Sequence, residues 1–204
     1  MSGSIDTTDT TATAPTGITR TRLMLVLILA FFALPLVVAW VLNFNGDFVP
    51  GATTNNGMLV QPVRPVTAVD LFDARGVAVD AKYFIGRWTM LYRHTGACDD
   101  ACQKTLYTVR QVRLTQGKNI DRIQRLLLLE GATMPAWAAT AAEQFPGMDI
   151  ARATNGAAAD AFGVAGRIYL IDPLGNLMME YALDADPRGM TKDLQRLLLI
   201  SYVG

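Results

Sequence analysis

Three side chains in this sequence could carry redox or soft-metal chemistry: Cys98, Cys102 and His94. They are its two cysteines and its one histidine, so a framework of several disulfides and a zinc cage built of cysteine and histidine are excluded by count. A thiolate attacks disulfides and binds Cu(I). The residue types therefore point to a small site for thiol exchange or copper.

The spacing places both cysteines at the start of a helix. Cys98 and Cys102 follow an apolar segment at 88–92 that we expect to be a strand, and a helix is expected over about 99–116. Both sulfurs then lie on one side of the first turn, where unpaired amides and the helix dipole favour a thiolate. Asp99 and Asp100 oppose that charge, so the direction of the thiol pKa shift stays open.

Each candidate residue also has a simpler interpretation. An isolated cysteine pair outside the cytoplasm is often a structural disulfide. His94 stands four residues before Cys98 and could be a third metal ligand or the proton partner of a thiol. A lone histidine in a loop is more often a surface or hydrogen-bonded residue. The position at a strand-to-helix junction favours a functional pair.

The elements that must position these residues alternate along the chain. We expect strands at 68–72, 88–92, 124–130 and 148–153, helices at 99–116 and 134–145, a hairpin of 167–171 and 176–181, and a last helix from Asp186 with Leu194, Leu197, Leu198 and Tyr202 on one stripe. This order predicts an α/β fold of the thioredoxin-like type, a mixed sheet with helices on both faces.

An apolar run near the N-terminus predicts one transmembrane helix at 23–43. Residues 23–42 carry no charge, and twenty helical residues span ~30 Å, the thickness of a bilayer's hydrocarbon core. Arg20 and Arg22 precede the run, which predicts a cytoplasmic N-terminus and a C-terminal domain outside the cytoplasm. A cleaved signal peptide ending near residues 37–39 is the alternative.

Composition divides the rest of the chain. Residues 1–22 are expected to be a disordered cytoplasmic tail, and 44–66 a tether with one short strand near 58–61. Residues 67–204 are enough for one compact domain. Basic and acidic residues balance at 18 each and no basic run interleaves with aromatics, so nucleic acid is not an expected partner.

Four stretches resemble the Sco (SenC-type) family. They are VDLFDARG at 69–76, GRWTMLY at 86–92, CDDAC at 98–102 and IYLIDPLG at 168–175. Proteins of this family are membrane-tethered thioredoxin-fold domains that help to build the copper centre of cytochrome c oxidase. The resemblance implies that fold, an oxidase subunit as partner, and copper binding and redox exchange by the cysteine pair.

The sequence departs from the family at several positions. In the family a proline follows each of the two cysteines, whereas this sequence has Asp99 and Gln103 at those positions. The family's distal histidine ligand would fall near Val164, within 163–166, where the sequence offers no ligand. Two thiolates alone can hold Cu(I), but a three-ligand Cu(II) site needs a further donor, from His94 or a partner. Thiol–disulfide exchange needs only the cysteines.

The leading hypothesis is a Sco-like assembly factor for cytochrome c oxidase in the bacterial inner membrane, with its domain in the periplasm. As a thiol–disulfide oxidoreductase it would attack through Cys98 and resolve through Cys102, with Cu(I) as cargo and His94 as a secondary candidate for ligation or proton transfer. Two alternatives stay open: a non-catalytic scaffold with a structural disulfide, and a periplasmic reductase unrelated to copper.

Overall fold

The structure, a computed structural model, describes residues 20–44, 55–66, 70–154 and 156–201. These residues belong to two compact units, Met1–Thr53 and Thr54–Gly204. Most of the predicted tail at 1–22, and residues 45–54 of the predicted tether, lie outside the described residues.

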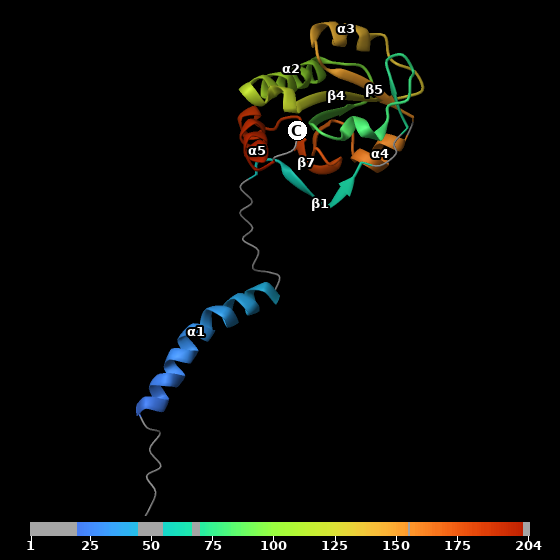
Figure 1. The fold of residues 1–204 in the computed structure, drawn as a ribbon. Helices are drawn as coiled ribbons and strands as arrows, with labels where there is room; N and C mark the ends of the chain where they lie inside the picture. Colours follow the sequence, from blue (N-terminus) through green and yellow to red (C-terminus); the bar gives the residue numbers. More distant parts are fainter. Residues whose placement is uncertain (1–19, 45–54, 67–69, 155, 202–204) are drawn as a thin grey trace, which may run out of the picture. The chain divides into compact units, whose positions relative to one another are not determined.

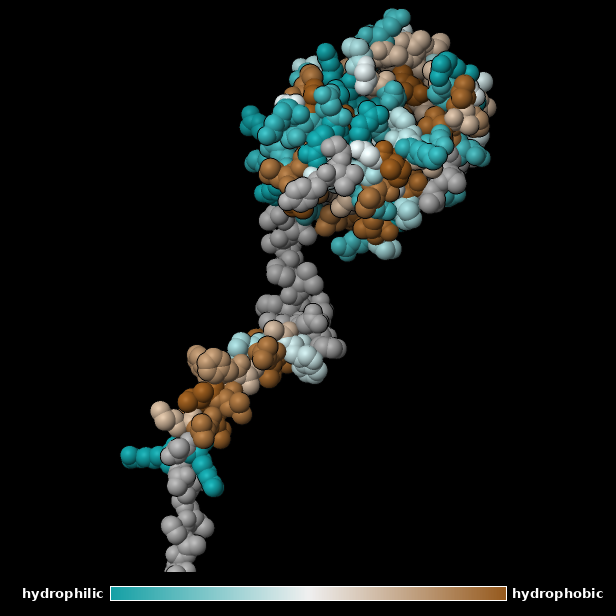
Figure 2. Space-filling model, in the orientation of Figure 1, coloured by the Kyte–Doolittle hydropathy of each residue, from teal (hydrophilic) through white to brown (hydrophobic). Residues whose placement is uncertain are grey.

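The first unit contains one helix, α1 (Arg20–Phe44), within its described part. Its segment Arg22–Val41 is long and apolar enough to cross a membrane, and Figure 2 shows α1 covered in apolar side chains along most of its length. Pro35 lies inside the helix. A membrane helix tolerates such a proline because neighbouring groups satisfy the freed carbonyl.

In the described part of the second unit, seven strands form one sheet (Figure 1). They are β1 (Met58–Pro65), β2 (Leu71–Asp73), β3 (Trp88–His94), β4 (Ile123–Glu130), β5 (Asp149–Ala153), β6 (Arg167–Ile171) and β7 (Asn176–Ala182). Their spatial order is β1-β7-β6-β3-β4-β5-β2. Strands β3, β4 and β5 are parallel and the other neighbours antiparallel, so the predicted mixed sheet is confirmed.

Helices cover both faces of this sheet. α2 (Asp100–Leu114), α3 (Trp137–Gln144) and α5 (Pro187–Ile200) pack on one face, and α4 (Ala157–Phe162) and the short helix η2 (Ala81–Phe84) pack on the other. Side chains of the central strands alternate between the two cores: Tyr92 and Leu127 join the first, Leu91 and Leu128 the second. The apolar run in β4 is thus buried on both sides, as a central parallel strand requires.

Three elements differ from the sequence expectation. The short strand expected at 58–61 extends to Pro65 and pairs with β7, so part of the expected tether belongs to the sheet. The strand expected at 68–72 is the three-residue β2, and residues 67–69 lie outside the described part. Helix α4 was not predicted, because six residues rich in alanine give no readable apolar stripe.

The two outer strands of the sheet are irregular. β1 contains Pro62 and Pro65, which have no amide hydrogen to donate, and its pairing with β7 changes register between Leu59 and Arg64. β2, at the opposite edge, is only three residues long. Neither edge offers a long regular row of free backbone groups.

One buried carboxylate fastens the start of the unit to helix α5. Asp193 accepts hydrogen bonds from the backbone amides of Asn56 and Gly57 at 2.7 and 2.9 Å, from the Asn56 side chain at 2.9 Å and from the Tyr181 hydroxyl at 3.2 Å. The point at which the chain enters the sheet is therefore fixed against α5 and β7.

Candidate redox site at the end of strand β3

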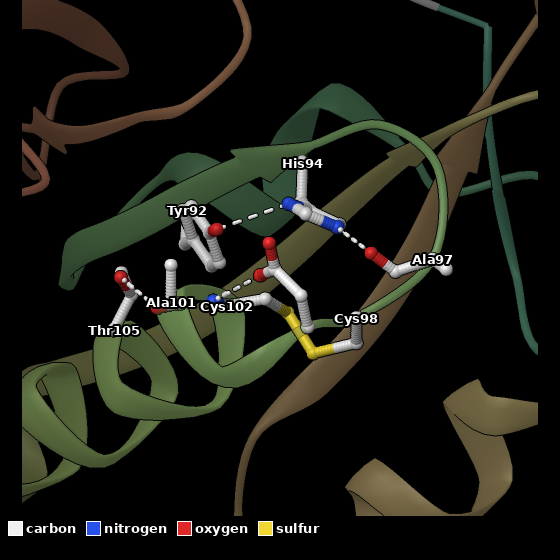
Figure 3. Close-up of a disulfide and its surroundings, with 8 residues drawn as sticks. Tyr92, His94, Ala97, Cys98, Ala101, Cys102 and Thr105 are labelled. Carbon is white, nitrogen blue, oxygen red and sulfur yellow. Dashed lines mark hydrogen bonds between the residues drawn. A yellow bond between two sulfur atoms is a disulfide. The ribbon is translucent and has the colours of Figure 1, made fainter.

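Cys98 and Cys102 form a disulfide where β3 leads into α2 (Figure 3). Their Cα atoms lie 5.1 Å apart. Cys98 precedes the helix cap and is partly buried, whereas Cys102 is the third residue of α2 and only 1% exposed. Of the two sulfurs, that of Cys98 is the one an incoming group can reach.

Asp99 caps helix α2. Its carboxylate accepts a hydrogen bond from the Cys102 amide at 2.9 Å, so it uses one of the helix-terminal donors that could otherwise stabilise a thiolate. The helix begins one residue later than expected, at Asp100, because Asp99 has the extended backbone of a cap.

His94 lies at the end of β3, and both of its ring nitrogens have protein partners (Figure 3). Nε2 is 3.0 Å from the Ala97 carbonyl and Nδ1 is 3.0 Å from the Tyr92 hydroxyl. Because a carbonyl only accepts, Nε2 carries the hydrogen, and Nδ1 of the neutral ring accepts from Tyr92. In this arrangement His94 holds the backbone of the loop that carries Cys98.

The side chains around His94 reinforce that arrangement. Burial raises the pKa of Tyr92 to about 12; a hydrogen bond from Thr105 acts against this and the charge of Asp99 acts with it. Tyr92 therefore keeps its proton at neutral pH and donates a hydrogen bond to Nδ1 of His94. The ring of Trp137, at the start of α3, meets the imidazole edge-on with centroids 5.9 Å apart.

A cavity of about 260 Å³ opens beside Cys102. One wall comes from β3 and the start of α2, and the other from Ala165, Gly166 and Leu183. The loop before β6 is the place where the Sco resemblance puts a distal histidine, and it does reach the cysteine site. Its exposed residue there is Val164, so residues 163–166 contribute no side-chain donor.

Arg93 fixes that loop to the sheet. Its buried guanidinium donates to the Gly163 carbonyl and forms an ion pair with Glu130 at 2.9 Å, and its own carbonyl accepts from the Gly166 amide at 2.9 Å. Glu130 in turn accepts from the Gly156 amide at 2.9 Å. Residues 92–94 of one strand thus hold both walls of the site.

The sequence-predicted candidates come together only in part. Cys98 and Cys102 are bonded, and His94 at the end of β3 is hydrogen-bonded to the loop that carries Cys98. No group of three or more His, Cys, Asp or Glu among the described residues could hold a metal ion. Sequence reasoning missed Tyr92 and Arg93. Both had a signal: Tyr92 shares a strand face with His94, and Arg93 is a charge that directly follows a buried strand.

Comparison with known proteins agrees with this architecture. Residues 88–201, more than half of the chain, match the model of the family described as "Transmembrane-like, thioredoxin-like, C-terminal domain". No curated protein matches the sequence.

Solved structures of Sco proteins have the same fold. Yeast Sco1 is 18% identical with a TM-score of 0.60, covering 70% of this chain and 98% of its own. Sco1 from Thermus thermophilus is 20% identical with a TM-score of 0.57, covering 72% and 99%. BsSco, in which a disulfide switch has been identified, is 12% identical with a TM-score of 0.55, covering 71% of this chain and 99% of its own. The thioredoxin-like fold of Sco proteins, expected from the sequence, is confirmed, and the chain belongs to the family of transmembrane-like proteins with a thioredoxin-like C-terminal domain.

Proposed function

We propose that this protein is a membrane-anchored thiol–disulfide exchange protein that assists the assembly of cytochrome c oxidase, with Cys98 and Cys102 as its redox pair. One observation carries the proposal: a partly exposed cysteine is bonded to a fully buried one at the start of a helix, beside a cavity. An attacking and a resolving thiol need that difference in accessibility.

The exchange transfers two electrons. In the reduced protein, the Cys98 thiolate attacks one sulfur of a partner's disulfide, and the other partner sulfur leaves as a thiolate and takes up a proton. The Cys102 thiol then loses its proton and attacks Cys98 Sγ, which releases the partner as a dithiol and restores the disulfide. An external dithiol protein must reduce the pair again before the next cycle.

Copper enters this proposal as cargo. Once reduced, Cys98 and Cys102 offer two thiolates, a donor set that suits Cu(I). A third donor is harder to supply from the described residues, because both His94 nitrogens are engaged and 163–166 has none. A yeast Sco1 structure contains copper, and by analogy the reduced pair would carry Cu(I) and would not retain Cu(II).

The location follows from the anchor. With Arg20 and Arg22 before the apolar span, the N-terminus would stay in the cytoplasm of a bacterial cell and the domain would lie in the periplasm. BsSco is described as a member of the Sco family of cytochrome c oxidase assembly proteins. An oxidase subunit that carries a cysteine pair is accordingly the proposed partner.

The test is the redox behaviour of the full chain in detergent micelles. The reduction potential of the wild-type disulfide is measured against a thiol buffer. The rate of exchange with a peptide disulfide is measured for the wild type, Cys98→Ala and Cys102→Ala. We expect Cys102→Ala to trap a mixed disulfide and Cys98→Ala to be inert. A potential below about −300 mV with no exchange would instead support a scaffold whose disulfide is structural.

Copper handling needs its own measurement. The reduced chain is titrated with Cu(I) in competition with a chelator, beside Cys98→Ala and His94→Ala. One-to-one binding that is lost in Cys98→Ala and kept in His94→Ala is expected. Rapid exchange without any Cu(I) binding would identify a reductase unrelated to copper.

A further inference from the structure

We propose that the domain rests on the surface of an anionic lipid bilayer through the end of helix α5 and the turn between β6 and β7. This α5 patch consists of Leu174, Leu197, Leu199 and Ile200. The proposal relies on the proposed membrane anchoring by α1 and is independent of the redox chemistry.

The α5 patch is strongly apolar for a surface. Leu174, Leu199 and Ile200 are 69%, 80% and 75% exposed. Two hollows, of about 390 and 210 Å³, lie side by side here and share Leu197 and Ile200 as lining residues. Figure 2 shows brown atoms beside teal ones where Figure 1 places α5. A contiguous apolar surface of this kind usually marks a binding face.

The charges on α5 favour an anionic surface as the binding partner of the α5 patch. Its exposed charged side chains, Arg188, Lys192 and Arg196, are all basic. Its one acid, Asp193, is buried and accepts four hydrogen bonds. Asp172 at the rim of the larger hollow is engaged by the amides of Leu174 and Asn176. An apolar patch beside basic side chains suits an anionic bilayer surface, because burial of apolar area and attraction to anionic lipids add to the binding strength.

The position of the linker adds an independent argument. Asn55, the first described residue after the linker, lines the smaller hollow, and Asn56 is bonded to Asp193. Ten residues, 45–54, separate Asn55 from the end of α1 in the sequence, and ten residues reach at most ~35 Å. A chain held in a bilayer by α1 therefore keeps the α5 patch within that reach of the headgroups, at high effective concentration.

The test uses the full chain in lipid nanodiscs, one copy per disc, with labelled Leu, Ile and Val methyl groups and a gadolinium-chelating headgroup lipid. In discs that contain phosphatidylglycerol, the Leu174, Leu199 and Ile200 methyl signals should lose most of their intensity. The control is Val164, which is 59% exposed in the loop before β6 and should keep its signal. This loop meets β3 at Arg93, near the strand's end, whereas Trp88 at its start lines the larger hollow. Leu199→Ser/Ile200→Ser should restore the Leu174 signal, and a purely phosphatidylcholine disc should weaken the effect.

Several results would overturn the proposal. Equal loss at Val164 would mean that the domain tumbles freely above the bilayer, and no loss at either place would mean that it stays away. Broadening without gadolinium that grows with protein concentration would identify a second copy as the occupant. Elution of the chain apart from the discs would refute membrane anchoring itself, which keeps that failure distinct from failure of the α5 patch.

Discussion

Replacing Asp193 with alanine tests how firmly the start of the domain is fastened. Two of the groups it holds are buried, the Gly57 amide at 2.9 Å and the Tyr181 hydroxyl at 3.2 Å. Leaving a buried donor without a partner costs ~1–3 kcal/mol, so the two together predict a loss of about 4 kcal/mol. The Asn56 donors are only partly buried and water can replace their acceptor.

The assay is urea unfolding of the full chain in micelles, followed by tryptophan fluorescence. A domain of this size has a free energy of unfolding of ~5–15 kcal/mol, so the variant should unfold at a much lower urea concentration with an unchanged slope. Asp184→Ala, an exposed aspartate just before α5, should stay within about 0.5 kcal/mol of the wild type. If Asp193→Ala matched Asp184→Ala, the bonds to the Gly57 amide and the Tyr181 hydroxyl would not contribute to stability and the reasoning would be wrong.

Three further changes give distinct results. Arg93→Met leaves Glu130 without its ion-pair partner and should lower the free energy of unfolding by ~3 kcal/mol, with faster amide exchange at 163–166. Arg167→Met, at an ion pair whose side chains are 32% and 24% exposed, should cost under about 1 kcal/mol. Burial raises the pKa of Tyr92 to about 12, so the hydroxyl loses its proton at a lower pH in the unfolded chain than in the folded one. The free energy of unfolding should therefore fall as pH rises from about 10 to 12, and equilibrium unfolding of Tyr92→Phe should show a smaller fall. Asp99→Ala should cost about 1 kcal/mol in the same assay by removing the cap of α2, and Asp99→Asn almost nothing.

The fold could be predicted from the sequence wherever one feature dominates. The apolar runs at 88–92 and 124–130 became the buried strands β3 and β4, and the turn at 172–175 became the bend between β6 and β7. These are local patterns with a strong period or a clear turn signal. β1 was predicted only in its first half, at 58–61, because most of its side chains are exposed and its pairing with β7 joins residues more than a hundred positions apart.

The residues of the candidate site could be predicted from the sequence, but their hydrogen-bond partners could not. Cysteine count and spacing pointed to Cys98 and Cys102, and the α2 boundary fell within one residue of the expected one. The partners of His94 could not be derived, because which nitrogen meets Ala97 depends on the path of a short loop. The same holds for the loop at 163–166, whose approach to Cys102 depends on Arg93 and on the packing of α4.

The irregular outer strands of the sheet would matter if the chain is anchored in a membrane as proposed. A protein held by one helix is confined to two dimensions, where copies meet far more often than in solution, and a regular strand edge would invite edge-to-edge aggregation. Pro62 and Pro65 interrupt the row of donors on β1, and β2 is too short to template a neighbour. Copies of an anchored domain could therefore be crowded side by side without pairing their sheet edges, and the end that carries the disulfide would stay accessible to the proposed partner.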